Sequence, residues 1–384
     1  MVKLKLLFIL FLASFALLAS GQAKVRLFAN QFPESAIFSV TKGEYELNPF
    51  NRRVLKINTS EPVLVLKYNG KVVVKVRNEE AFICDSLILT GKTGNDYFSL
   101  KMNQKYSSKQ YYSDDLKCLP DFNTLVFINT TDVEKYISGV VLTEGGPGKS
   151  LEFYKTQAII ARTYMYKYFD RHSDDGFNVC DNTHCQAFNG LSSDSLINIA
   201  VMQTSGLVII DKDSMLIMSA FHSNCGGETS SAGDVWLTHQ PYLKSVTDPY
   251  CTSSRNATWQ KSIPVSEWLN YIRKSGGNNL TDEKPALNFV QTSRVPDYKT
   301  ASFTVPLRTI RSDFNLRSTF FSVYANGDSV ILKGKGYGHG VGLCQEGAMT
   351  MASRGFNYKQ IINFYFSGVF ITDIKNVKLL PAYR

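Results

Sequence analysis

Four residues in one short stretch have the types and spacing of metal ligands. The segment HSDDGFNVCDNTHC, residues 172–185, contains His172, Cys180, His184 and Cys185. Thiolate and imidazole ligands favour Zn²⁺, whereas Ca²⁺ and Mg²⁺ prefer oxygen ligands. A closed set of four would make a structural site, because a catalytic zinc keeps one position open for water. The alternative for the same segment is a Cys180–Cys185 disulfide, which an oxidising compartment would favour.

Glu144 is the candidate for acid-base chemistry. It precedes the Gly-Gly-Pro-Gly sequence at residues 145–148, which cannot continue a helix, so we expect the preceding helix to stop near Thr143 and Glu144 to project from the bend. The negative end of the helix dipole disfavours a charged carboxylate there and raises its affinity for a proton. A general acid needs that property. A surface glutamate beside a turn would give the same sequence pattern.

Two histidines lie in glycine-rich loops that each follow a predicted strand. His222 is next to Ser223, and His339 is close to Tyr337. Such loops let the backbone approach a ligand closely, so we expect the two loops to form two walls of one cleft. An exposed Tyr337 would suit stacking on a sugar face. A nucleophilic Ser223 is disfavoured because no G-x-S-x-G elbow surrounds it, and each histidine alone could equally be a hydrogen-bonded structural residue.

The elements that must position these residues change along the chain. Residues 24–129 contain short β-branched runs and an Asn69-Gly70 hairpin turn, which indicate a β-rich domain over residues 22–130. Within it, residues 101–121 are polar and Tyr-rich without a clear period. We therefore interpret them as a loop or an insertion.

From residue 131 onwards helical patterns dominate. A T-x-x-E capping box of Thr131 and Glu134 predicts the start of the first helix. The other expected elements are helices at 150–170, 194–204, 343–354 and 358–366, strands at 207–211 and 215–221, and a hairpin at 320–334 with Asn326-Gly327 at its turn. The sequence therefore predicts an α+β protein, with a helical and mixed-sheet catalytic region over 131–384 and a smaller β-rich N-terminal domain.

The first 21 residues have the pattern of a signal peptide. Lys3 and Lys5 precede an apolar run at residues 6–18, and small residues follow at 19–21. The apolar run is shorter than the roughly 20 residues that span a bilayer, and no later run is longer. We therefore expect a soluble exported protein, in the periplasm or cell envelope, with no stable membrane span after cleavage. An uncleaved signal anchor is the alternative.

Charge and cysteine content add to this picture. The formal charge is +9 and falls to +7 without Lys3 and Lys5. That excess favours an anionic partner, and export favours the cell wall over nucleic acid, although a merely solvated surface would look alike. An odd count of seven cysteines leaves at least one outside any internal disulfide. Our provisional pairs are Cys84 with Cys118 and Cys225 with Cys251, which leaves Cys344 over.

Five segments, in this order, resemble the SpoIID/LytB family of sporulation and cell-wall proteins. They lie at residues 133–144, 155–164, 220–227, 241–243 and 336–345. The resemblance runs from about Thr131 to Gly368 and is weaker in the N-terminal part. Two departures stand out, since Gly145 and Gly146 replace the family's usual Met and Pro, and Cys344 replaces its common Ser.

The resemblance implies a peptidoglycan lytic transglycosylase. Glu144 would protonate the glycosidic oxygen and then, as a base, let the C6 hydroxyl attack C1 to give a 1,6-anhydro product. It also implies zinc at the cluster of residues 172–185 and peptidoglycan glycan strands as the partner. The substrate-binding residues implied by the matching motifs are Arg162, His222, Ser223, Tyr337, His339 and Gln345.

The family also leaves two rival functions open. Its LytB branch includes amidase enhancers, so the chain could be a wall-binding module that assists a cell-wall amidase or another envelope protein. A zinc-dependent amidase or deacetylase is the third possibility. It requires a metal whose open coordination position faces the cleft between His222 and His339.

Overall fold

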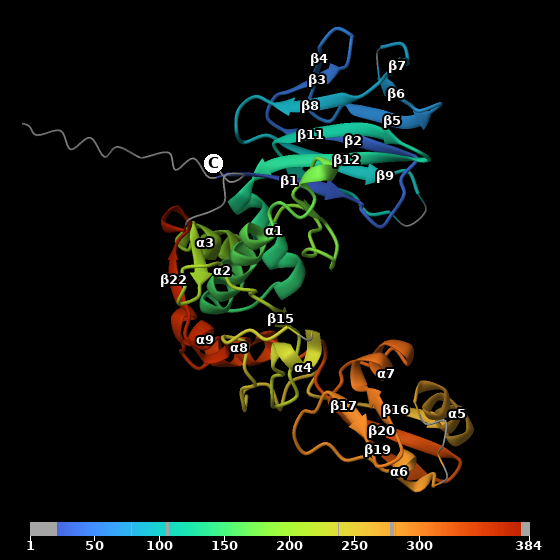
Figure 1. Ribbon diagram of the computed structural model, residues 1–384. Coiled ribbons are helices and arrows are strands. Elements are labelled where there is room, and N and C mark those ends of the chain that lie inside the picture. The colour runs from blue at the N-terminus through green and yellow to red at the C-terminus, as the bar shows by residue number, and fades with distance from the viewer. Residues whose placement is uncertain are drawn as a thin grey trace, which may run out of the picture.

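The computed structural model describes residues 21–77, 79–104, 107–236, 238–276, 280 and 282–377. Apart from Gly21, the expected signal peptide lies outside the described residues. Figure 1 shows a strand-rich region above a group of helices, with a smaller mixed unit beside them. The predicted α+β class is confirmed. No helix in the described ranges is long and apolar enough to cross a membrane.

The N-terminal region is a sandwich of two sheets. The seven-stranded sheet contains β1 (Gln22–Leu27), β3 (Tyr45–Pro49), β4 (Leu55–Ile57), β8 (Leu87–Gly91), β11 (Asp115–Asp121), β12 (Thr124–Asp132) and β13 (Val179–Cys180). The six-stranded sheet contains β2 (Ser35–Lys42), β5 (Pro62–Tyr68), β6 (Lys71–Val76), β7 (Phe82–Cys84), β9 (Tyr97–Met102) and β10 (Gln110–Ser113). Alternate side chains of these strands fill the space between the sheets. β13 comes from far along the chain and pairs in parallel with β1.

The expected loop at residues 101–121 is wrong, because most of it forms β10 and β11. β11 pairs with β12 on one side and with β8 on the other. Tyr112, Leu116 and Cys118 are fully buried, while charged residues such as Lys117 occupy the outer positions. The two-residue alternation there is too short to recognise in the sequence.

Three helices follow the sandwich, α1 (Val133–Gly145), α2 (Leu151–Lys167) and α3 (Ser195–Gln203). The start of α1 differs from the expected capping box. Asp132 caps the helix by accepting hydrogen bonds from the backbone N–H groups of Glu134 and Lys135. Thr131 is not the cap, because its hydroxyl is hydrogen-bonded to Asp114 and Ser113 instead of to the helix N–H groups.

The end of α1 also differs from the prediction. The helix continues past Thr143 to Gly145, so Glu144 lies in its last turn instead of on a bend after it. Gly146 then ends the helix with a positive φ of 68°, and its N–H donates to the Leu142 carbonyl. A Cβ at position 145 would lie 3.1 Å from the ring of Phe153, so a larger residue there would require that ring to shift slightly.

The strands expected at 207–211 and 215–221 do not form a regular hairpin. β14 (Leu207–Ile210) pairs instead with β22 (Phe370–Asp373), near the end of the described chain. Residues 215–220 contribute one isolated bridge, Ile210 to Leu216. β15 (Phe221–His222) then pairs in parallel with β21 (Leu343–Cys344), which brings the two glycine-rich loops together.

The remaining described elements complete the helical region and add a separate unit. The helical region also contains η1 (Ser173–Asp175), α4 (Ala232–Trp236), α8 (Gln345–Ser353), α9 (Tyr358–Tyr365) and η2 (Ile374–Asn376). The inserted unit contains β16 (Thr258–Pro264), α5 (Val265–Ser275), α6 (Lys284–Leu287), β17 (Asp297–Lys299), β18 (Thr304–Pro306), α7 (Leu307–Asp313), β19 (Phe321–Asn326) and β20 (Ser329–Lys335). The predicted hairpin at 320–334 is confirmed as β19 and β20.

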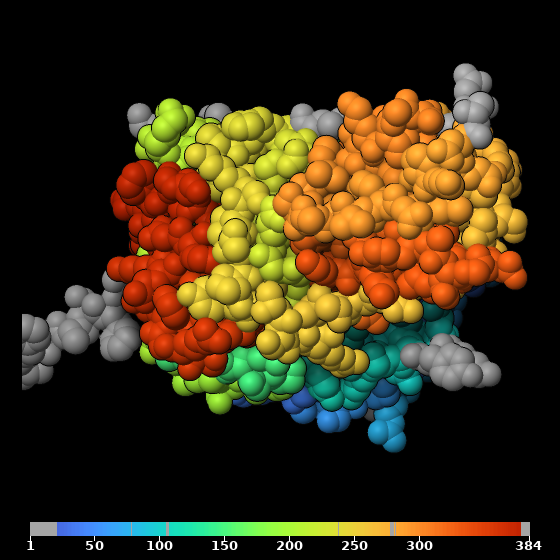
Figure 2. All heavy atoms as spheres, turned by 90° about the horizontal axis from the view of Figure 1, so that it is seen from below, coloured from blue at the N-terminus to red at the C-terminus, as the bar shows by residue number. Residues whose placement is uncertain are grey.

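Two hydrophobic cores correspond to this division. One core runs continuously through the sandwich and the helical region. A second core, built around Trp268 and Tyr298, lies within the inserted unit. Figure 2 shows the inserted unit (orange) and the segment with α8 and α9 (red) on opposite sides of the segment that contains α4 (yellow). The sequence reading had not separated this unit from the rest of residues 131–384.

Candidate active site and metal cluster

A cavity of about 1000 Å³ lies where the helical region meets the two glycine-rich loops. Its lining comes from the end of α1, from α2, and from the segments around residues 184, 220 and 339. α4 adds Trp236, and α7 adds Arg311. Of the sequence candidates, Glu144, His184, Cys185 and His339 line this cavity.

Glu144 presents a partly buried carboxyl group to the cavity. Its Oε1 accepts a hydrogen bond of 2.8 Å from the backbone N–H of Ala187. Burial raises the pKa of Glu144 above its usual value, and the N–H of Ala187 opposes that rise without cancelling it. The group therefore keeps its proton to a higher pH than an exposed glutamate, which suits a proton donor.

Gln345 fixes the backbone beneath Glu144. Its Nε2 donates to the Glu144 carbonyl at 3.1 Å and to Gln157 Oε1 at 3.4 Å. The Gln345 side chain is almost fully buried at the start of α8. This geometry makes Gln345 a positioning residue for α1, and it does not line the cavity as the substrate contact that the family resemblance implied.

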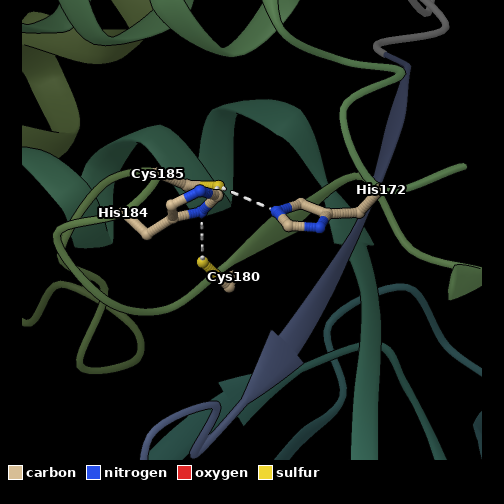
Figure 3. A group of neighbouring side chains, drawn as sticks. All are labelled: His172, Cys180, His184 and Cys185. Carbon is tan, nitrogen blue, oxygen red and sulfur yellow. Dashed lines mark hydrogen bonds between the residues drawn. The ribbon is translucent and has the colours of Figure 1, made fainter.

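The four metal-ligand candidates converge in space. Their ligand atoms all lie within 4.8 Å of one another, and Figure 3 shows the side chains directed toward a common point. Cys185 Sγ is 3.4 Å from His172 Nε2, and His184 Nδ1 is 3.7 Å from each of the sulfurs of Cys180 and Cys185. A hydrogen bond from Cys180 lowers the pKa of the Cys185 thiol to about 6. Two nitrogens and two sulfurs at this spacing fit a tetrahedral zinc ion.

Local structure explains why these four residues meet. His172 follows α2, Cys180 lies in β13, and His184 and Cys185 occupy the turn after that strand. Pairing of β13 with β1 fixes Cys180, and Asn182 Oδ1 accepts from the His184 N–H at 2.8 Å to close the turn. The same turn continues two residues to Ala187, which binds Glu144. One loop therefore carries candidate metal ligands and the N–H group that binds Glu144.

The expected disulfides are not formed. All seven cysteines are free and buried, including Cys180 and Cys185. The sulfurs of Cys225 and Cys251 are close, at 3.3 Å, but unbonded. Cys344 was expected to be left over, yet its sulfur accepts from the backbone N–H of Cys225 at 3.3 Å. Cys344 lies beside Cys225 and Cys251 because β21, which contains Cys344, pairs in parallel with β15.

His222 and His339 do form adjacent walls, with ring centroids 5.4 Å apart. His339 Nδ1 accepts from the Val341 N–H at 3.1 Å, and its Nε2 donates to the Phe221 carbonyl at 2.9 Å. Burial lowers the pKa of His339 to about 4 and that of His222 well below its usual value. Both rings are therefore neutral near pH 7, and both nitrogens of His339 are engaged by the backbone.

His222 differs from His339 in one respect. Its Nδ1 donates to the Val341 carbonyl at 3.1 Å, while its buried Nε2 has no hydrogen-bond partner among the described residues. The His222 side chain does not line the cavity, so it supports the wall that His339 presents.

The other implied contact residues lie outside the cavity lining. Ser223 Oγ accepts from Asn256 Nδ2 at 3.3 Å, and Tyr337 is 46% exposed with its ring under Arg317. Arg162 is fully buried, and its guanidinium binds Glu134 and the Leu207 carbonyl. Arg162 therefore holds α1 and α2 to β14 and does not face a ligand.

The cavity also has a wall of aromatic and basic residues that sequence reasoning did not single out. The Arg171 guanidinium lies 4.1 Å from the Tyr168 ring centroid and donates to the Tyr164 hydroxyl at 2.9 Å. Across the cavity, the Trp236 ring lies 5.0 Å from His339. The spacing of Tyr164, Tyr168 and Arg171 fits one helical face, but α2 ends at Lys167 and Arg171 reaches the two tyrosines from the turn that follows.

A segment of the chain around the site matches a known protein family. The family model for SpoIID, described as Stage II sporulation protein, matches residues 122–210. That range includes Glu144 and all four residues of the metal cluster, but neither glycine-rich loop.

Relatives extend the likeness over more of the chain. An uncharacterized protein of Brachyspira hyodysenteriae is 28% identical over 351 residues, covering 88% of this chain and 89% of that protein. The amidase enhancer of Bacillus subtilis is 31% identical over 290 residues, covering 62% of this chain and only 40% of that longer protein. Stage II sporulation protein D of Bacillus amyloliquefaciens is 29% identical over 267 residues, covering 64% of this chain and 76% of that protein. The family model and these relatives show that the chain is similar to members of the SpoIID/LytB family, in agreement with the order of its motifs.

Proposed function

We propose that this protein is a peptidoglycan lytic transglycosylase that cleaves the glycosidic bond between MurNAc and GlcNAc. One observation carries the proposal. Of the described residues that line the cavity, Glu144 is the one carboxylic acid. Glycosidases that use water generally need two carboxyl groups, whereas attack by the substrate's own C6 hydroxyl needs one.

The reaction follows from this single group. Protonated Glu144 donates its proton to the glycosidic oxygen as the bond from that oxygen to MurNAc C1 breaks. The developing oxocarbenium ion is then attacked by the C6 oxygen of the same sugar, while the Glu144 carboxylate removes the C6 hydroxyl proton. A 1,6-anhydro sugar is formed, GlcNAc leaves with a free hydroxyl, and Glu144 ends protonated again.

The cavity walls support a glycan as the ligand. Tyr168 and Trp236 offer aromatic faces for sugar rings, and Arg171 and Arg311 place two cations in the same space. Cations suit the lactyl carboxylate of MurNAc. The chain's positive charge and its expected export, to the periplasm or cell envelope, agree with a wall polymer as the partner.

His172, Cys180, His184 and Cys185 would hold a structural zinc ion. Bound zinc supplies a cross-link here, since four protein ligands leave no position for an activated water. This closed set argues against the zinc amidase alternative. The role of the four side chains is to fix the turn that ends at Ala187, whose N–H orients the Glu144 carboxyl group.

Product analysis tests the proposal. Wild-type protein and Glu144→Gln would be incubated with purified peptidoglycan, both with attached peptides and after their removal, and the soluble products weighed by mass spectrometry. Transglycosylation yields muropeptides lighter by one water than hydrolysis does. We expect anhydro products from the wild type only. Equal product from both proteins, or only hydrolysed or peptide-cleaved products, would rule the assignment out.

A second function is favoured by the likeness to the Bacillus subtilis amidase enhancer. In that case the chain binds glycan without cutting it and accelerates a cell-wall amidase. The same digest distinguishes the two functions when an amidase is added. Enhancement that persists in Glu144→Gln, with no anhydro product from the wild type, would select the enhancer.

A further inference from the structure

A second group of metal-ligand side chains lies away from the cavity lining. Cys225, Asp248, Cys251 and Cys344 are all fully buried, and their ligand atoms lie within 4.8 Å of one another. Cys225 follows β15, Asp248 and Cys251 lie in the segment between α4 and β16, and Cys344 ends β21. Three distant segments therefore deliver three thiols and a carboxyl group to one point.

The distances within this group suit an ion better than a bond between sulfurs. Cys225 Sγ lies 3.3 Å from Cys251 Sγ and 3.2 Å from Asp248 Oδ2. Sulfurs that share a tetrahedral zinc ion at about 2.3 Å are roughly 3.8 Å apart. A disulfide would use two of the thiols at about 2.05 Å and leave the third thiol and the carboxylate without a purpose.

The surroundings supply the donors that thiolates and a buried carboxylate require. Cys344 Sγ accepts from the N–H groups of Cys225 at 3.3 Å and Gly347 at 3.4 Å, the latter at the N-terminus of α8. Asp248 accepts from the Tyr365 hydroxyl at 2.9 Å and from the Tyr250 N–H at 2.8 Å. Such outer hydrogen bonds orient metal ligands and stabilise their charge.

A buried arginine, Arg294, partly offsets the negative charge that the four ligands would carry. The Arg294 guanidinium donates to the Cys225 carbonyl at 2.6 Å and to the Glu228 carbonyl at the same distance. Three thiolates and one carboxylate around a divalent ion leave a net charge of −2. Arg294 and the helix N-terminus offset part of that charge.

We propose that Cys225, Asp248, Cys251 and Cys344 form a second, closed site for a thiophilic divalent ion of the zinc class. Soft thiolate ligands select zinc over calcium or magnesium, and four protein ligands make the site structural. The ion ties the loop after β15 to the start of α8. It thereby holds the wall that carries His339 against Gln345, the residue that binds the Glu144 backbone.

Metal counting tests the site independently of catalysis. Native mass spectrometry of the purified chain, loaded with zinc and freed of loose metal, should show two ions. Cys344→Ser should retain one ion and Cys180→Ser one ion, while the double variant should retain none. Cys84→Ser is the matched control, because it removes a buried cysteine of the sandwich and should leave two ions.

Two further measurements keep the test decisive if a variant does not fold. X-ray absorption at the zinc edge of the wild type should count five sulfurs over two ions, two from the first cluster and three from the second. Alkylation of the denatured, unreduced chain should modify all seven cysteines. One ion with two sulfurs, a second ion retained by Cys344→Ser, or a Cys225–Cys251 disulfide would overturn the proposal.

Discussion

Two glutamates on the same helix have opposite surroundings. Glu134, in the first turn of α1, accepts from Arg162, from Ser205 Oγ at 3.2 Å and from the Gly206 N–H at 3.1 Å. Glu144, in the last turn, accepts one hydrogen bond from Ala187 and otherwise faces the cavity. The Glu134 carboxylate is held by a cation, whereas no cation among the described residues binds Glu144.

This difference separates a structural acid from a chemical one. A carboxylate that pairs with a buried arginine serves to hold elements of the fold together. A carboxyl group desolvated without a cation keeps its proton, and can release it when a bond polarises nearby. The family motif contains both glutamates, so residue type alone does not assign their roles. The five predictions that follow test the contrast.

Replacing the acid should have the largest effect on turnover. Glu144→Gln keeps the shape and can still accept from Ala187, but it cannot donate a proton. We expect anhydro-product formation to fall by about 100- to 10,000-fold, the usual contribution of a general acid. The measurement is the initial rate of product release from purified glycan.

The same substitution should leave stability intact near neutral pH. Because folding raises the pKa of Glu144, ionisation of the buried carboxyl destabilises the folded state as pH rises above the unfolded value of about 4.3. Gln carries no such cost. Denaturant unfolding should therefore find Glu144→Gln at least as stable as the wild type at pH 7, with the difference vanishing below about pH 4. A large loss of stability instead would contradict the contrast.

Breaking the ion pair between Arg162 and Glu134, at the start of α1, should lower the stability of the fold. Arg162→Met leaves Glu134 without its cation, and we expect a loss of about 3 kcal/mol in the free energy of unfolding. The double variant with Glu134→Gln should recover part of it. Turnover per folded molecule should stay near the wild-type value. A stable Arg162→Met protein with a raised KM would instead support the substrate contact that the family implies.

The pH dependence of turnover should report the environment of Glu144. Since burial raises its pKa, activity should decline as pH rises through a value above the normal range for glutamate. Ala187→Pro removes the N–H that lowers this pKa, so the decline should move to higher pH. Ala187→Gly keeps the N–H and serves as the control. An unchanged profile in Ala187→Pro would show that another group governs the decline.

The smallest effect on turnover is expected from replacing Gln345, which donates a hydrogen bond to the Glu144 backbone carbonyl. Gln345→Ala removes one buried hydrogen bond, which costs about 1 kcal/mol of stability. It also frees the Glu144 carbonyl, so we expect turnover to fall several-fold without a change in pH profile. A shift in that profile would place Gln345 in direct contact with the acid.

The sequence predicted features that depend on neighbouring residues. The convergence of His172, Cys180, His184 and Cys185 could be predicted because these candidate metal ligands occupy one 14-residue stretch. The helices α2, α3 and α9 could be predicted because their patterns and caps are local. The role of Glu144 came from the family motif. The position of Glu144 within the helix was predicted wrongly. We expected the helix to stop before Glu144, but α1 includes Gly145, which packs against the ring of Phe153.

Features that depend on distant pairing were missed. The group of Cys225, Asp248, Cys251 and Cys344 forms only when β15 pairs with β21. No residue spacing in the sequence predicts that pairing. Likewise, the buried position of Arg162 follows from where β14 and α3 pack. In β11 the alternation covers only Leu116 and Cys118, and β10 shows none, so the pattern was too short to recognise in the sequence.

The pairing of β13 with β1 limits how this protein can have been assembled in evolution. Val25 and Arg26 pair with Val179 and Cys180, and Asp181 accepts from the Ala29 N–H. A strand that carries a candidate metal ligand, Cys180, thus completes a sheet of the N-terminal sandwich. The sandwich cannot be exchanged independently of the helical region. A recombination event that replaced the sandwich would also have to supply an edge strand able to pair with β13, the strand that contains Cys180. Sandwich and helices should therefore be inherited together.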